Sequence, residues 1–373
     1  FCDGLPLFRI EERFAREGVP VDRGTLSRWV DAVAAGLAAI VVAMKRDAIA
    51  RAFCIATDAT GISIQPVRDS NAPRRPCKKG TFFTLVADDD HALFEYMERE
   101  TSSGVSKMLH GFEGYVQADA KSVYDAFFTV RKASEEVPEG GPEVGCWSHA
   151  RRHFWEAAVC KYSVGLDGLR RINAVFEADR KLADLPPVQK KLRRDAVVKP
   201  LVDDFFSWAK AEQAKVDRRG LVATALGYAI RQELPLRAFL QDGRLRLDNN
   251  AAERALRNPI AIGRKAWLFF GSDDHANAAA NLFSLLASCK LHGLDPEDYL
   301  RDVIRVMPYW PRERYLELAP STGPPLGLGS TIASSIGPSG TSPSRHRRPP
   351  RKSSNRRPEG DGGTSSIVSI VLG

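Results

Sequence analysis

Three β-rich runs follow one another directly after residue 52, and they constrain the fold more than any other feature of the chain. The runs are FCIATDATGISIQPV, GTFFTLVAD and HALFEYMER, and turn residues separate them. Runs of β-branched and aromatic residues bounded by turn residues are typical of strands. The sequence therefore predicts an antiparallel meander of three strands.

Beyond the meander the sequence alternates between helix and strand. A helix is expected from Thr101 to His110, then a strand at GYVQAD, a helix at KSVYDAFF, and a strand at EVGCWSHA that leads into the helix ARRHFWEAAV. This element order is that of a ribonuclease-H-like sheet. We therefore predict an α/β fold with a ribonuclease-H-like mixed sheet, which by itself does not define a function.

Helical sequence interrupts the predicted core, whose first part is assigned to residues 51–164. Residues 165–245 contain charged amphipathic helices without a strand signal, so they predict an α-helical insertion. Residues 246–318 are assigned to the last part of the core with its C-terminal helices, including a long helix over Ala276 to His292. Residues 319–373 are rich in Pro, Gly, Ser and Arg, which predicts a disordered basic tail.

The N-terminal segment, residues 1–50, predicts two helices separated by a break at residues 18–20. Thr25 is expected to cap the second helix. Two helices joined in this way indicate a helix-turn-helix, in which Arg23 and Arg28 would lie where the second helix makes DNA contacts. A helical hairpin that only packs against the core is an equally good interpretation.

Net charge is a weak guide to the partner. It is +8, but the segment from Pro320 to Gly373 holds seven Lys or Arg against two Asp or Glu and so contributes +5 of it. The remaining body is only mildly basic. Only the positions of the charges, and not their sum, can therefore indicate a nucleic-acid partner.

Cysteine usage and apolar patterning bear on location. The six cysteines are scattered, and the sequence shows neither a secretory segment nor a run of about 18 apolar residues. A cytoplasmic protein with reduced thiols is the expectation. Because the chain begins at Phe1 inside sequence of structured character, we also expect that upstream residues are missing.

Two acids stand out because they occur in apolar strands. Asp58 interrupts IATDAT, and Asp119 ends YVQAD. A lone carboxylate in such a strand is costly unless it is paired or bound to a metal. On neighbouring strands, about 5 Å apart, the two could share a hard divalent cation. For either acid alone, a turn cap or an edge-strand position is an adequate explanation.

A third acid, Glu253, lies one turn into a predicted helix that starts at Asn249. At 3.6 residues per turn Asn249, Glu253 and Arg257 share one side of that helix. If this side faces the sheet, Glu253 completes a three-carboxylate site with Asn249 beside it. The alternative is a helix N-terminal acid favoured by the macrodipole and paired with Arg257.

Five phrases together resemble the DDE transposases of the insertion sequence 66 family. They are ATDATGISIQ, GYVQADAKSVYDAFF, VGCWSHARRHFWEA, LDNNAAERALRNPIAIGRKAWLFFGS and SLLASCKLHGLDPEDYLRDV, in this order and at comparable spacing, over most of Pro6 to Tyr309. The family's metal-binding acids match Asp58, Asp119 and Glu253. The resemblance implies a ribonuclease-H-like core, split by a helical insertion, that holds two Mg²⁺ ions, with Mn²⁺ as a substitute.

The resemblance also implies an activity and partners. Such an enzyme cleaves transposon-end DNA and then joins the freed 3′-hydroxyl to target DNA at one two-metal site. Its partners would be transposon-end and target DNA, further copies of the chain in a homodimer or larger assembly, and helper proteins of the same element, with no membrane. Two other functions stay open: a nuclease of the same fold without joining activity, and a non-catalytic helix-turn-helix DNA-binding protein.

A cysteine–histidine cluster follows the second acid. Cys146, His149 and His153 recur at i, i+3 and i+7, with Cys160 two turns on, so zinc ligation is one interpretation. Related transposases with insertions carry a Cys-x-x-His pair here, which Cys146 and His149 resemble. We favour a supporting role beside the active site over an inert core position or a zinc site.

Basic residues flank these motifs, where they could neutralise DNA phosphates. They are Arg151, Arg152, Arg254, Arg257, Arg264 and Lys265. The Arg264-Lys265 pair, which precedes an aromatic run, is the strongest DNA-contact prediction. Solvated helix faces and local ion pairs are the alternative for scattered arginines.

Overall fold

The computed structural model of the chain describes residues 4–66, 75–128, 143–257, 260 and 263–323, without the side chain of Arg264. The predicted tail from residue 324 onward lies outside the described residues. Residues 319–323 were also assigned to this tail, but contrary to the prediction they are ordered. Pro320–Thr322 form a short 3₁₀ helix (η7) in which Pro320 is buried. The Thr322 hydroxyl donates to the carbonyl oxygens of Glu317 and Ala319 at 2.8 Å and holds this turn in place.

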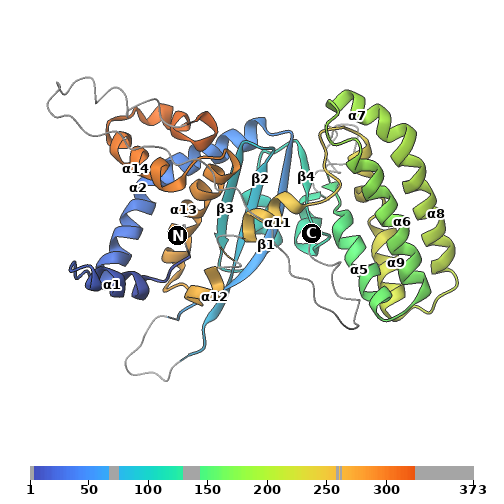
Figure 1. Cartoon of the computed structure of the whole chain (residues 1–373), viewed down its shortest axis with the longest axis horizontal. Coiled ribbons are helices and arrows are strands. Elements are labelled where there is room, and N and C mark those ends of the chain that lie inside the picture. Colours follow the sequence, from blue (N-terminus) through green and yellow to red (C-terminus); the bar gives the residue numbers. More distant parts are fainter. Residues whose placement is uncertain (1–3, 67–74, 129–142, 258–259, 261–262, 324–373) are drawn as a thin grey trace, which may run out of the picture. The chain divides into compact units, whose positions relative to one another are not determined.

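A five-stranded mixed sheet forms the centre of the molecule (Figure 1). The strand order is β3-β2-β1-β4-β5, in which β1 pairs antiparallel with β2, β2 antiparallel with β3, and β4 parallel with both β1 and β5. The strands are β1 (Cys54–Ile64), β2 (Lys78–Ala87), β3 (His91–Met97), β4 (Tyr115–Gln117) and β5 (Glu143–Val144). The predicted three-strand meander is confirmed.

Helices cover both faces of this sheet. Ile55 faces α2 (Arg23–Arg51) and α3 (Ser102–Met108) in the largest apolar core. On the opposite face, Ala56 and Val86 pack against Ala252 of α11 (Asn250–Leu256). Because side chains alternate along a strand, Asp58 shares the face of Ala56 and points toward the α11 side.

The outer edge of β3 is covered by α13 (Asp273–Leu291). Two serines of this helix act as strand partners: the Ser284 hydroxyl accepts from the Phe94 amide at 2.8 Å, and the Ser288 hydroxyl accepts from the Ala92 amide at 3.0 Å and donates to the Ala92 carbonyl. The helix therefore satisfies backbone groups that an edge strand would otherwise leave open.

A helical unit with its own apolar core follows β5 (Figure 1). Trp147 is fully buried at its centre, and its indole N–H donates to the Leu236 carbonyl at 2.7 Å. The core also contains Val144 and Leu247, so it is continuous with the sheet edge. The unit consists of α5 (Trp147–Val159), α6 (Ser163–Arg180), α7 (Pro187–Arg193), the π-helical turn η2 (Arg194–Val198), α8 (Lys199–Gln213), α9 (Leu221–Arg231), α10 (Glu233–Arg237) and η3 (Ala238–Leu240).

The buried side chain of Arg194 connects separate segments of this helical unit. Its side chain is fully buried, forms a two-pronged ion pair with Asp179, donates to the carbonyl oxygens of Phe239 and Asp242, and stacks on the Phe239 ring. Four N–H groups and one face of the guanidinium are thus used, which offsets the desolvation of its charge.

The N-terminal helices are α1 (Leu7–Arg16) and α2. Asp22 caps α2 by accepting from the Thr25 amide at 3.1 Å, so the predicted Thr25 cap lies three residues too late. Among the described residues α2 alone is long and apolar enough to cross a membrane by length and composition, contrary to the expectation of no such run. In the structure it is a core helix: Leu37, Ile40 and Met44 are buried.

Local differences from the predicted elements have identifiable causes. The fifth strand ends at Val144 because the Gly145 amide turns to the Pro235 carbonyl at 2.8 Å. The helix predicted at KSVYDAFF starts as a 3₁₀ turn, η1 (Ser122–Tyr124). The remaining elements are α12 (Gly263–Trp267), α14 (Pro296–Val306), η5 (Met307–Tyr309) and η6 (Arg312–Leu318).

Candidate active site

Parallel pairing of β1 and β4 brings Asp58 and Asp119 together. Ala56 is paired with Gln117, and each acid follows two residues later on the same side of its strand. The Asp58 carboxylate is half-buried and accepts from the Ala59 amide at 2.7 Å. The sheet register therefore places the two carboxylates next to each other where β4 ends.

Asp119 has an unsatisfied atom. Its Oδ1 is buried without a hydrogen-bond partner, while its Oδ2 lies 3.8 Å from the Lys121 ammonium. A buried carboxylate oxygen without a donor is costly, and such atoms are rare in native proteins. The arrangement leaves room for an electropositive group on Oδ1.

Glu253 reaches the same place from the first turn of α11. Its position depends on Asn249, which is fully buried and whose side-chain amide donates to the Thr57 carbonyl at 2.8 Å. Ala252 packs against Ala56 and Val86. One hydrogen bond and one small-residue contact thus fix the start of α11 directly over the strand that carries Asp58.

The three carboxylates influence one another electrostatically. Burial raises the pKa of Asp58 above its ordinary value; the Ala59 amide and Lys121 oppose this rise, and the negative charges of Asp119 and Glu253 add to it. Like charges held this close favour either proton uptake or a shared cation. Asp119 and Glu253 thus both lie within electrostatic range of Asp58, but among the described residues the three carboxylates do not bring their oxygens all within 4.8 Å of one another.

The Cys146–His149 pair adjoins Glu253. Cys146 is the fully buried residue before α5, and its sulfur accepts from the Asn249 amide at 3.3 Å. Ligand atoms of Cys146, His149 and Glu253 all lie within 4.8 Å of one another. Two further buried atoms in this region, His149 Nδ1 and Asn249 Oδ1, have no hydrogen-bond partner.

The rest of the predicted cysteine–histidine cluster is not gathered here. The His153 ring stacks on Tyr228, with centroids 4.7 Å apart, and Cys160 is exposed at the far end of α5. Cys146 precedes the helix, so the expected single helical face through these residues does not form. Trp155 of the same helix is 44% exposed.

Basic residues predicted to contact DNA fall into two groups. Some are engaged locally: Arg23 with Glu11, Arg28 with Thr25, Arg151 with Asn173 and Arg152 with Glu156. Others are exposed: Arg254 and Arg257 at the end of α11, and Lys265 on α12. Among the described side chains, the expected Glu253–Arg257 ion pair is not formed. Arg264 has no described side chain.

Some residues of the site were not singled out in the sequence. The Tyr124 hydroxyl lies 3.1 Å from the Thr57 hydroxyl beneath Asp58, and burial raises the pKa of Tyr124. Lys121 could have been found from its position two residues after Asp119. Thr57 and Tyr124 carry no local signal, because their role depends on contacts far apart in the chain.

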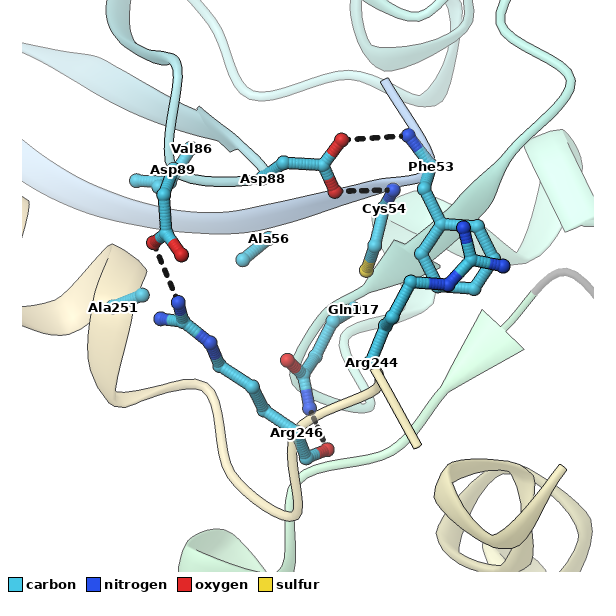
Figure 2. Close-up of a pocket in the computed structure, with 10 residues that line it drawn as sticks. All are labelled: Phe53, Cys54, Ala56, Val86, Asp88, Asp89, Gln117, Arg244, Arg246 and Ala251. Carbon is cyan, nitrogen blue, oxygen red and sulfur yellow. Dashed lines mark hydrogen bonds and ion pairs between the residues drawn. The ribbon is translucent and has the colours of Figure 1, made fainter. Parts of the chain in front are cut away.

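A cavity of about 380 Å³ lies on the same face of the sheet, next to Ala56 and Gln117 (Figure 2). Gln117 donates to the Arg246 carbonyl at 2.9 Å, and the Arg246 guanidinium pairs with Asp89 at 2.6 Å. These contacts hold the chain that leads from the helical unit to α11 across the sheet. The cavity therefore lies beside the segment that leads into α11, whose Ala251 lines it.

Comparison with known proteins gives a consistent result. Residues 1–278 match the family described as "Transposase IS66 family", and residues 284–321 match the "IS66 C-terminal element". Two similar proteins of Sinorhizobium fredii are the uncharacterized proteins y4hP, 30% identical over 84% of this chain, and y4qI, 26% identical over 88%. The chain spans 58% and 61% of their respective lengths. No solved structure matches.

Proposed function

Because this chain belongs to the transposase IS66 family, we propose that it is the catalytic part of a DDE transposase that cuts transposon-end DNA and joins it to target DNA. Asp58, Asp119 and Glu253 are the catalytic carboxylates in this proposal. The observation that supports it most is their convergence from β1, the end of β4 and α11, with one carboxylate oxygen buried and unpartnered.

The sheet supports a ribonuclease-H-like core. Its central strand β1 carries Asp58 and has an antiparallel neighbour on one side and a parallel neighbour on the other. The parallel neighbour, β4, ends directly before Asp119. This topology requires a crossover through α3 between β3 and β4, and it brings the end of β4 beside Ala56 in β1, two residues before Asp58.

The donor set suits hard divalent cations. Three carboxylates offer only oxygen ligands, which Mg²⁺ and Mn²⁺ prefer. The Asp119 oxygen that lacks a donor and the raised pKa of Asp58 both indicate missing positive charge. Two such cations held by Asp58, Asp119 and Glu253 would supply Lewis acidity for the attacking and the leaving oxygen of a phosphodiester.

Other residues of the chain position these groups. Asn249 holds the start of α11 on the Thr57 carbonyl and so keeps Glu253 over the strand. Lys121, close to Asp119, adds positive charge at the mouth of the site. The candidate contacts for DNA phosphates are Arg254 and Arg257, exposed at the end of α11, and Lys265, exposed on α12.

The test replaces each carboxylate by its amide. Asp58→Asn, Asp119→Asn and Glu253→Gln should each lower Mg²⁺-dependent cleavage of transposon-end DNA by about 100-fold or more, while DNA binding stays within about twofold, because transition-state charge stabilisation is lost and phosphate contacts remain. Glu156→Gln, an acid of α5 paired with Arg152, is the matched control and should cleave normally.

Two outcomes would count against the proposal. Undiminished cleavage by the three amide variants would show that Asp58, Asp119 and Glu253 are not the catalytic carboxylates. Cleavage without any strand-transfer product, under conditions in which 3′-hydroxyl ends accumulate, would favour a nuclease of the same fold.

A further inference from the structure

Next to the three acids lies a second group of potential ligands with different chemistry. A thiol from Cys146, an imidazole nitrogen from His149 and a carboxylate oxygen from Glu253 lie within 4.8 Å of one another. Cys146 and His149 come from the start of α5, and Glu253 comes from the first turn of α11. Two helices that are about 100 residues apart in the chain thus bring their N-terminal ends to one point.

The surroundings of this group contain polar atoms without partners. Cys146 is fully buried, and its sulfur accepts a hydrogen bond from the Asn249 backbone, as metal-bound thiolates commonly do. His149 Nδ1 and Asn249 Oδ1 are buried without partners. Asn249 is itself 0% exposed, so its free amide oxygen is a second, independent sign of a missing ligand.

We propose that Cys146, His149 and Glu253 form a binding site for one borderline-soft divalent cation of the Zn²⁺ type. Sulfur, nitrogen and oxygen donors together select such ions over Mg²⁺, and three protein ligands leave a fourth position open. Binding displaces the thiol proton of Cys146 to solvent and forms one sulfur–metal bond, with no change of oxidation state.

Glu253 would then belong to two sites. It serves the soft cation with Cys146 and His149, and it serves the hard cations with Asp58 and Asp119; this second role rests on the proposed function. A carboxylate engaged by Zn²⁺ is less available to the acid pair. Zinc occupancy is therefore expected to inhibit Mg²⁺-dependent cleavage.

The first experiment measures zinc binding to the purified chain by competition with a chromophoric chelator, without DNA. One equivalent of Zn²⁺ is expected to bind, and His149→Ala and Cys146→Ser should each weaken its affinity by roughly 100-fold or more, since a direct ligand is removed. His153→Ala and Cys160→Ser change the same residue types on or beside α5 outside the group, and they should leave the affinity unchanged.

Cobalt provides a readout specific to the sulfur. Co²⁺ bound at this site should show a sulfur-to-metal charge-transfer band that disappears in Cys146→Ser and persists in Cys160→Ser. Because Cys146 is buried, circular dichroism would accompany each titration; if Cys146→Ser unfolds, the partly exposed His149→Ala decides the matter. Absence of a tight zinc equivalent, or zinc binding unaffected by His149→Ala, would overturn the proposal.

A second experiment tests the sharing of Glu253. Glu253→Gln should weaken zinc binding by about tenfold or more, whereas Asp58→Asn and Asp119→Asn should not. Zinc affinity unchanged in Glu253→Gln would remove Glu253 from the site. These titrations need no catalysis, so a chain that binds zinc but fails to cut DNA would refute the proposed function and leave the zinc site standing.

Discussion

At the scale of single residues, several side chains of the acidic site lower the stability of the metal-free fold. Asp58 occupies a strand position that an apolar or amide side chain would fill without desolvating a charge. One carboxylate oxygen of Asp119 is buried without a hydrogen-bond donor, and so is the side-chain amide oxygen of Asn249. Strain of this kind is common at functional sites, where the ligand supplies the missing partner.

Asp58→Asn should therefore stabilise the metal-free protein. The pKa of Asp58 is raised by burial, so its contribution to stability is complete below the pKa of the unfolded chain and is lost as pH rises through the folded pKa. In EDTA at neutral pH the variant should gain on the order of 1 kcal/mol in urea unfolding. The gain should shrink toward about pH 4, where the Asp58 carboxyl of the folded parent chain is protonated and therefore neutral, like the amide of the variant.

Magnesium should reverse this order, since only the parent chain keeps all ligands and gains from binding. Glu156→Gln is the control and should show no gain in EDTA. A destabilised Asp58→Asn protein in EDTA at pH 7 would mean that the carboxylate is held by contacts other than those described.

At the scale of elements, the strands of the meander were predictable because their alternation is local. The converging acids were predictable only as separate candidates, and a family resemblance was needed to join them. What the sequence did not reveal depends on distant contacts: β5 stops early where Gly145 meets the Pro235 carbonyl, and α11 lies over β1 because Asn249 bonds to Thr57. The helices within residues 165–245 were predicted from their charged periodicity, yet nothing local marks Arg194 as buried.

Arg194→Ala should destabilise the helical unit strongly. The substitution leaves the Asp179 carboxylate and two carbonyl oxygens without their donor, which costs about 3–5 kcal/mol for a buried pair. Arg194→Lys keeps the charge but not the two-pronged geometry and should recover only part of the loss. Arg193→Ala, at an exposed neighbouring position, should change stability little. Urea unfolding followed by tryptophan fluorescence measures all three, and equal stability of the Arg193 and Arg194 variants would contradict this role.

At the scale of the whole molecule, the proposed activity requires a long polyanion to reach the carboxylates. Most predicted DNA-contacting arginines are engaged by neighbouring side chains, whereas Arg254 and Arg257 are exposed on the helix of the third acid and Lys265 is exposed on α12. The distribution of charge around α11, more than the net charge of the chain, is therefore the feature that bears on DNA.

Removing charge from this region should lower the salt dependence of DNA binding. The double variant Arg257→Ala, Lys265→Ala should reduce the slope of log affinity against log salt by about 0.9 for each DNA phosphate that the protein no longer neutralises. Arg301→Ala, whose guanidinium is held by Glu297 and Asp298 on α14, is the matched control and should keep the slope. A slope unchanged by the double variant would show that basic residues other than Arg257 and Lys265 neutralise the DNA phosphates.

The helical unit separates Asp119 from Glu253 by about 130 residues of chain. During synthesis at roughly 5–20 residues per second, the first two acids leave the ribosome on the order of ten seconds before the third. A nascent chain therefore has no complete set of carboxylates until the insertion has been made and Asn249 can dock on β1. Order of synthesis alone therefore delays the assembly of the proposed catalytic centre until α11 has been made.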